Sequence, residues 1–333
     1  MRFWLLLILI ILGGFGCTAT SPISIQETVY TSFIINTHDW TQPEESIATI
    51  NRIIDLHELY KIPVDIYLTD PMVQLYVAQA PELIERLKTS PYVAVSYHLR
   101  PPTPYYAGFH EEIFNGLSEN EIKAKILEYE EHAIDLKTGE PTDRPGGYQY
   151  LKDLIGYAPI VIGSAEGKDK LHKILDQIYK EKGATFTLQH NTIGKLGDTF
   201  NGLFLRPENL EIKVYERKDE ISVDALMADA LKTLTNTRPT FLNVKWHENN
   251  FYSSGTGWSE IYFSDGNTHQ IPLNPPYSQT ISGLTQTAKT HEQQLIQWER
   301  YEALMKYVKD RPETFTTINA KNLLDLIKVE TQE

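Results

Sequence analysis

The sequence predicts an α/β fold built on a parallel sheet. Four short runs rich in Val, Ile, Tyr, Phe and Thr have the composition of strands, and a segment with helical spacing usually follows each run. This alternation is typical of parallel strands joined by helical crossovers. The carboxyl ends of such strands share one face, where active sites are usually built. Each run closes on an ionisable residue, and these residues are Asp39, Asp70, His98 and His247.

The composition limits the classes of partner. The formal net charge is −13, and we find no stripe of clustered Lys and Arg. Phosphate contacts need such clusters, so we expect no nucleic-acid partner. The 19 Tyr and 5 Trp could supply ring faces that suit sugars, although most of them are expected to fill the core.

The amino-terminal segment has the pattern of a secretory signal, which we assign to residues 1–16. Arg2 precedes an apolar stretch over residues 3–12, which is about half the ~20 residues that a spanning helix needs. Cys17 is the only cysteine and follows the small residue Gly16. A bacterial lipoprotein signal places its lipidated cysteine there, while the alternative is an ordinary signal with a chance cysteine.

These features predict an exported protein, anchored in a bacterial cell envelope through a lipid on Cys17. Residues 17–27 are rich in Thr, Ser, Pro and Ile, and are expected to form a short tether. Residues 28–330 are expected to form one domain, because a single α/β barrel can reach this length.

The first half of that domain alternates strands and helices. Thr41 and Glu44 have the spacing of a capping box, and Pro43 suits a first helical turn, so a helix is expected to begin there. Residues 99–117 form a long loop rich in proline and tyrosine, and long loops in compact domains are often functional. The strands of this half are expected at residues 29–36, 64–68 and 92–97.

The second half is less regular. Residues 251–282 are rich in Gly, Ser, Asn, Pro and Tyr, and are expected to form a long surface insertion. Residues 143–148 are expected to turn into a helix near residues 150–155. The remaining helices are expected at residues 118–136, 168–180, 223–234, 291–309 and 320–327. The remaining strands are expected at residues 160–163, 184–189, 203–205, 239–246 and 315–317.

The strand ends carry the candidate chemistry. Asp39, with His38 beside it, could bind a metal or act as a general base, or Asp39 could cap a helix next to a buried His38. His98 could be a metal ligand, as neutral imidazoles often are, or a packed turn residue. His247 and Glu248 open a dense polar segment after a well-defined strand.

The segment Asn36-Thr37-His38-Asp39-Trp40 resembles the opening motif of the polysaccharide deacetylase-like superfamily. That motif is Thr-Phe-Asp-Asp, in which one Asp is the base and the next is a metal ligand. Two alignments remain open. Either Asp39 matches the metal ligand and His38 replaces the base, or Asp39 matches the base and Trp40 replaces the ligand.

Further motifs extend the resemblance over roughly residues 29–327. His98 matches the first of two family histidines that lie four residues apart, but Pro102 stands at the second position. Residues Arg144 to Tyr148 resemble the family motif Arg-Pro-Pro-Tyr. His247, at the end of a late strand, resembles the family's catalytic histidine.

The resemblance implies a deformed (β/α) barrel of about seven parallel strands with outer helices. It also implies a divalent metal, often zinc, and hydrolysis of an acetyl group on a polysaccharide or glycan. The metal would be held by Asp39 and His98 with His38 or His247 as third ligand, since zinc enzymes normally use three protein ligands. His247 would otherwise be the general acid.

Two alternatives to a deacetylase remain open, and the same residues are expected to contact carbohydrate in each case. A glycoside hydrolase in the same barrel would use carboxylates such as Asp39 and Glu248. A catalytically inert sugar-binding lipoprotein is the other alternative. The residues expected to contact carbohydrate are Trp40, Tyr97, Arg100, Tyr105, Arg144, Tyr148 and Trp246.

The export hypothesis gives a first testable prediction. The mature protein should begin at Cys17 and carry lipid, because the cysteine directly follows the apolar stretch and its small residues. Mass spectrometry of membrane-extracted protein should show an acylated Cys17, and Cys17→Ser should release the protein or block its processing. Cleavage at another residue without an acyl mass would contradict the prediction.

Overall fold

The computed structural model describes residues 28–330 apart from 107, 164–169, 190–193, 215–220, 235–238, 255–259 and 266–269. The expected signal, the tether and Cys17 therefore lie outside the described residues. Among the helices of the described part, none is both long and apolar enough to cross a membrane.

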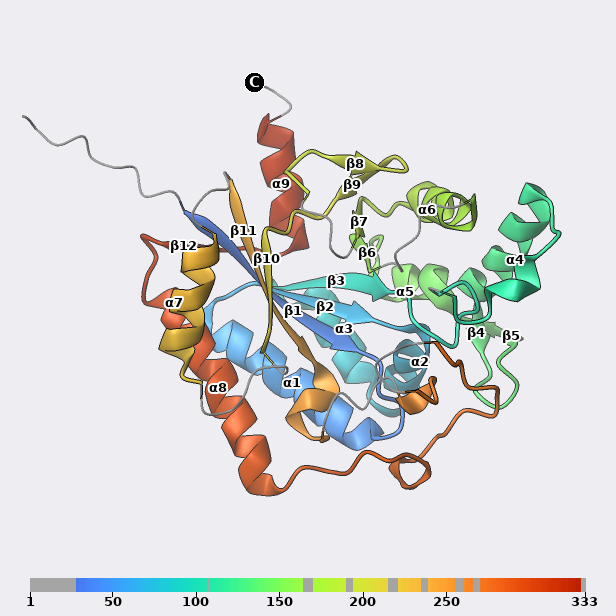
Figure 1. Ribbon diagram of the computed structural model, residues 1–333, viewed down its shortest axis with the longest axis horizontal. Helices are drawn as coiled ribbons and strands as arrows, with labels where there is room; N and C mark the ends of the chain where they lie inside the picture. Colours follow the sequence, from blue (N-terminus) through green and yellow to red (C-terminus); the bar gives the residue numbers. More distant parts are fainter. Residues whose placement is uncertain are drawn as a thin grey trace, which may run out of the picture.

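A curled, mostly parallel sheet forms the centre of the fold (Figure 1). Its strands run in the order β10–β11–β1–β2–β3–β6–β7–β9–β8, and β12 pairs with the first residues of β1. Neighbouring strands are parallel except for β8 and β9. The bounds are β1 Val29–Thr37, β2 Val64–Leu68, β3 Val93–His98, β6 Val161–Gly163, β7 Phe186–Leu188, β8 Thr199–Phe200, β9 Leu203–Leu205, β10 Leu210–Lys213, β11 Thr240–His247 and β12 Phe315–Thr317.

Helices surround this sheet, which confirms the α/β class and the deformed barrel (Figure 1). A separate two-stranded sheet pairs β4 His132–Ile134 with β5 Pro141–Pro145. The α-helices are α1 Pro43–Tyr60, α2 Asp70–Gln79, α3 Pro81–Thr89, α4 Glu119–Glu131, α5 Gly147–Ile155, α6 Lys170–Lys182, α7 Val223–Thr233, α8 His291–Lys309 and α9 Ala320–Glu330. The short 3₁₀ helices include η1 Glu111–Phe114, η3 Glu248–Phe251 and η6 Ile281–Gly283.

Strand alternation gives the sheet two different faces. Phe33 and Ile35 of β1 belong to the large core that packs against the surrounding helices, whereas Ile34 belongs to a second core on the opposite face. This is the two-residue period of a pleated strand. We call the face that carries Ile34 the inner face. Tyr97 of β3 and Trp246 of β11 belong to the large core, so their neighbours in sequence point to the inner face.

The last helix covers the amino-terminal end of the inner face. Leu323 and Ile327 of α9 pack in the second core with Ile34 and Tyr67. The helix is fixed there by Asp65 of β2, whose Oδ1 accepts a hydrogen bond of 2.8 Å from the backbone N–H of Ala320.

Asp65 also joins opposite parts of the curled sheet. Its Oδ2 lies 2.7 Å from Nη2 of Arg206, the residue after β9, and neither side chain is exposed. Arg206 Nη1 donates a second hydrogen bond of 3.0 Å to the hydroxyl of Tyr67. A single carboxylate thus connects β2, the end of β9 and the start of α9.

Four local predictions were wrong. The helix expected at residues 118–136 ends at Glu131, and His132–Ile134 forms strand β4 instead. The capping box at Thr41 is absent, because Gln42 is the N-cap and makes no side-chain cap hydrogen bond. The chain before α5 forms β5 instead of a simple turn. The expected surface insertion packs inward in part, because Ile261, Tyr262 and Phe263 are buried in the large core. Their apolar surface outweighs the loop-like composition around them.

The buried ion pair gives a prediction about stability. Arg206→Met should lower the free energy of unfolding by about 3–5 kcal/mol, because it leaves Asp65 buried without its counter-charge. Urea denaturation measures the change, and the double variant Asp65→Asn/Arg206→Met should recover part of the loss.

The matched control is Arg86→Met, which removes a partly exposed ion pair with Asp55 (2.6 Å). This change should cost no more than about 1 kcal/mol. Equal losses in the two methionine variants would show that burial does not decide the strength of the Asp65–Arg206 pair.

Candidate functional site

Three histidines meet at the carboxyl ends of β1, β3 and β11. His38 follows β1 directly, His98 ends β3 and His247 ends β11. The ring centroids of His38 and His247 are 4.8 Å apart. All three are buried, with exposed fractions of 0 to 4%. The neighbours of His98 and His247, Tyr97 and Trp246, face the large core, so these imidazoles face the inner side. We call His38, His98 and His247 the histidine cluster.

Two cations border the histidine cluster. Arg100 is buried, and its Nε donates a hydrogen bond of 3.0 Å to Nε2 of His98. Lys245 precedes His247 by two residues, which places it on the same face of β11, and its ammonium lies 2.8 Å from Glu211.

Burial and these charges keep the imidazoles neutral. Burial is the largest cause that lowers the pKa of His38, His98 and His247 well below 6.5, and the charges of Arg100 and Lys245 lower it further. A neutral imidazole can accept a proton, so the cluster holds potential bases near neutral pH.

Glu248 joins the ends of β1 and β11. Its Oε1 accepts hydrogen bonds from the backbone N–H groups of His38 (2.6 Å) and Asp39 (2.7 Å). Its Oε2 lies 4.0 Å from Nε2 of His38. Burial, and then the charge of Asp39, raise the pKa of Glu248 to about 8. Glu248 is therefore mostly protonated at neutral pH and can donate a proton.

Asp39 is held by the residues that follow it. Its Oδ1 accepts hydrogen bonds from the N–H (3.0 Å) and the hydroxyl (2.5 Å) of Thr41, and its Oδ2 accepts one from Gln42 (3.3 Å). Burial raises the pKa of this carboxyl, although the bonds from Thr41 oppose the shift. The arrangement is an Asx turn, which orders the entry to α1.

The expected metal ligands do not fit a metal ion in this conformation. His98 contacts the carbonyl oxygen of Gly163 through Nδ1 (3.3 Å), and its Nε2 accepts from Arg100. A ligand nitrogen must offer its lone pair to the metal, and on His98 that lone pair faces Arg100. Over the described residues, no three His, Cys, Asp or Glu side chains are arranged to hold an ion.

All five aromatic residues expected to contact sugar lie in the large core, namely Trp40, Tyr97, Tyr105, Tyr148 and Trp246. Tyr97 and Trp246 point away from the histidine cluster, because they alternate with His98 and His247 along their strands. Tyr105 donates its hydroxyl hydrogen bond to the buried Glu130. Trp40 donates from Nε1 to the carbonyl oxygen of Ser278 (2.8 Å). A sugar ring could stack on these side chains only after the segments that cover them had moved.

The segment that resembles the third family motif joins secondary structure elements. The backbone N–H of Gly147 donates to Asp70 (2.8 Å), and the hydroxyl of Tyr148 donates to the carbonyl oxygen of Pro159 (3.0 Å). A side chain at Gly147 would meet the backbone of Glu130 at 2.4 Å. Arg144 is exposed on β5. This packing explains the two glycines without a substrate.

Sequence reasoning missed Lys245, which borders the histidine cluster. A signal was present, because Asn243, Lys245 and His247 alternate with Leu242, Val244 and Trp246 along one strand. A polar series with a period of two indicates one face with its own chemistry.

Solved structures of other proteins share the fold of this chain at low sequence identity. No protein-family model and no curated protein matches the sequence. Among solved structures, a 4-alpha-glucanotransferase from Thermococcus litoralis matches with a TM-score of 0.50 and 11% identity over 90% of this chain. The match spans 40% of the glucanotransferase chain.

Polysaccharide deacetylases are also among the structural neighbours. A Mycobacterium smegmatis protein described as a polysaccharide deacetylase has a TM-score of 0.48 and 8% identity, with 92% of each chain covered. The corresponding values for a polysaccharide deacetylase from Bacillus cereus are 0.37 and 12%, with coverage of 87% of this chain and 90% of that chain. At these identities the likeness is one of fold.

The raised pKa of Glu248 predicts a pH-dependent stability. The folded state holds a proton that the unfolded chain releases above pH 4.5, so wild-type stability should fall as pH rises from about 4.5 to about 8. Glu248→Gln keeps an acceptor for the two N–H groups and removes the titration. The free energy of unfolding of the variant, relative to that of wild type, should therefore rise by roughly 1.4 kcal/mol for each pH unit across this window.

Urea denaturation at pH 5, 6, 7 and 8 measures this difference. Glu119→Gln, which removes an exposed carboxylate at the start of α4, is the control and should show no such trend. A constant difference between wild type and Glu248→Gln at all four pH values would mean that Glu248 titrates normally.

Proposed function

We propose that this protein is a carbohydrate-active hydrolase that removes an acyl group, such as acetyl, from a glycan. The observation that carries the proposal is the histidine cluster beside Arg100, Lys245 and Glu248, at the carboxyl ends of parallel strands. Active sites of such barrels are built at this end. The name of the glucanotransferase that shares the fold supports carbohydrate as the substrate class.

These residues could perform acyl hydrolysis by acid–base catalysis. A neutral imidazole, His38 or His247, would take a proton from water while the water oxygen attacks the acyl carbon. The positive charges of Arg100 and Lys245 would stabilise the negative charge that develops on the carbonyl oxygen. Protonated Glu248 would give its proton to the leaving oxygen or nitrogen, and the imidazolium would return its proton to restore Glu248.

The position of Asp39 favours acyl transfer to water over cleavage of a glycosidic bond. Glycoside hydrolases place two carboxyl groups about 5–10 Å apart on either side of the bond. Glu248 faces the histidine cluster, but both carboxylate oxygens of Asp39 are bonded to Thr41 and Gln42. The hydrogen bonds of Asp39 thus order the entry to α1, and Glu248 is the carboxyl that faces the cluster.

A metal-dependent form of the reaction stays a prediction from the family resemblance. Asp39, His98 and one of His38 and His247 would hold zinc only after Nε2 of His98 had left Arg100. We therefore assign no step of the mechanism to a metal.

A sugar-binding protein without catalysis is the second candidate. The burial of the histidine cluster, at 0 to 4% exposure, supports this alternative, because a substrate reaches such a cluster only when the covering segment moves. Both candidates agree with export and a lipid on Cys17, which we propose from the sequence.

The catalytic proposal predicts which substitutions abolish activity. On acetylated oligosaccharides, His247→Ala and Arg100→Met should each lower kcat at least about 100-fold, because they remove a proton-transfer group and a charge that stabilises the transition state. Acetate release measures the rate. The control, His291→Ala, changes an exposed histidine at the start of α8 and should retain wild-type activity.

Metal dependence is tested on the same protein. The hydrogen bond from Arg100 to His98 predicts that acetate release survives dialysis against a chelator, and that zinc titration calorimetry gives no stoichiometric heat. Stoichiometric zinc binding that is lost in His98→Ala would establish the metal-dependent form. Sugar binding without acetate release under either condition would favour the second candidate.

A further inference from the structure

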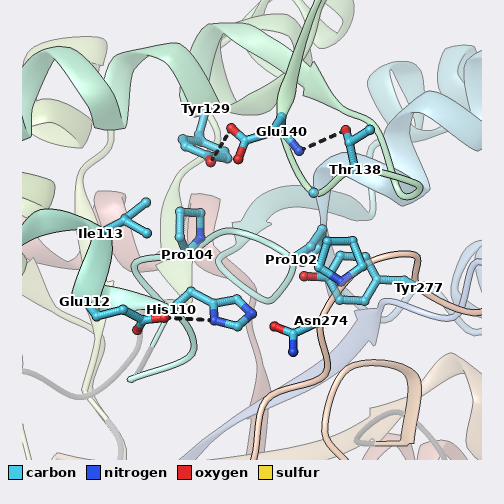
Figure 2. Close-up of a pocket in the computed structure, with 12 residues that line it drawn as sticks. Pro102, Pro104, His110, Glu112, Ile113, Tyr129, Thr138, Glu140, Asn274 and Tyr277 are labelled. Atoms are coloured by element: carbon cyan, nitrogen blue, oxygen red, sulfur yellow. Dashed lines mark hydrogen bonds and ion pairs between the residues drawn. The ribbon is translucent and has the colours of Figure 1, made fainter.

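A pocket of about 200 Å³ lies outside the histidine cluster, where four segments meet (Figure 2). The segments are the loop from β3 through η1, helix α4, the turn between β4 and β5, and the stretch around residues 274–277. The lining includes Pro102, Pro104, His110, Glu112, Glu140 and Tyr277.

Hydrogen bonds and one glycine hold the walls together. The backbone N–H of Tyr277 donates to the carbonyl oxygen of Leu136 (2.9 Å), and His110 Nε2 contacts the carbonyl oxygen of Leu273 (3.2 Å). Gly139 has a φ of +75°, and a Cβ there would lie 3.3 Å from Pro275. Glycine thus allows the β4–β5 turn to approach the 274–277 stretch.

The pocket has acidic groups around an apolar middle. Figure 2 shows Tyr129 and Glu140 on one side of Pro104, with Glu112 and His110 on the other. The lining contains two carboxylates and neither Lys nor Arg. Such a lining favours a ligand that combines a positive charge with an apolar ring face.

We propose that this pocket binds one sugar ring that carries a free, protonated amine. The volume is below the 300–1,000 Å³ or so of pockets for larger ligands, which suits a single ring. Glu112 and Glu140 would attract the ammonium group, while Pro104 and Tyr277 would contact the C–H face of the ring. An N-acetylated ring has no such charge, so the pocket distinguishes the two forms.

One loop contributes residues to the pocket and borders the histidine cluster, so a sugar bound in the pocket would lie on the same loop as the proposed catalytic groups. Pro102 follows Arg100 by two residues, and the hydroxyl of Thr103 donates to the carbonyl oxygen of Arg100 (2.6 Å). The identification of the ligand as a sugar rests on the proposed function. If that function holds, the substrate is a glycan in which some amino groups are already free.

Titration calorimetry with a glucosamine trisaccharide and its fully N-acetylated analogue tests the proposal. The free amine form should bind more tightly, and its affinity should fall as salt rises. Glu112→Gln and Glu140→Gln should each weaken it about three- to fivefold, with no effect on the acetylated form. The matched control, Glu128→Gln, removes an exposed carboxylate of α4 that does not line the pocket, and should bind as wild type does.

The outcomes separate this proposal from the proposed function. Equal affinity for the two trisaccharides, or an affinity unchanged in Glu112→Gln/Glu140→Gln, overturns the pocket assignment even if acetate release is observed. Amine-selective binding that persists in His247→Ala supports the pocket. Such binding in a protein that hydrolyses no acyl group keeps the pocket and removes the proposed function.

Discussion

The two-residue period of the parallel strands is the constraint on which the rest of this structure depends. It sends Tyr97 and Trp246 into the large core, and the histidines next to them to the inner face. The parallel register of β1 and β11, in which Asn36 lies opposite His247, then brings the ends of both strands together. Along these strands, one residue packs in the core and the next faces the candidate site.

Much of the fold could be predicted from the sequence, because its central strands are strongly apolar and its helices follow at regular intervals. The strands that end near Asp39, His98 and His247 were located within a residue or two. The β4–β5 hairpin was not expected, since His132 continues the pattern of a helix and the pairing is set by tertiary contacts. Composition also misled at residues 261–263, where three apolar side chains bury a segment that otherwise resembles a loop.

The candidate site was predicted less completely than the fold. The convergence of the histidines follows from topology, which periodicity in the sequence reveals. The state of Asp39 depends on a local turn to Thr41, and that of His98 on Arg100 two residues later. Both depend on the orientation of a side chain after its strand has ended, where the two-residue period no longer predicts the orientation. The burial that raises the pKa of Glu248 depends on all the elements around it, so this pKa could not be predicted from one segment of the sequence.

The bond between Asp65 and Ala320 joins residues 255 positions apart, and this separation bears on how the chain folds during synthesis. Domains are made from the amino terminus at about 5–20 residues per second. Strands β1 to β3 are therefore made well before α9. Until α9 has been made, their inner face is not covered by that helix. Non-local contacts of this kind also slow folding, because the chain must close a long loop before the contact forms. The barrel is complete only after its last helix has been made, so β1 to β3 are without part of their final contacts for the longest time.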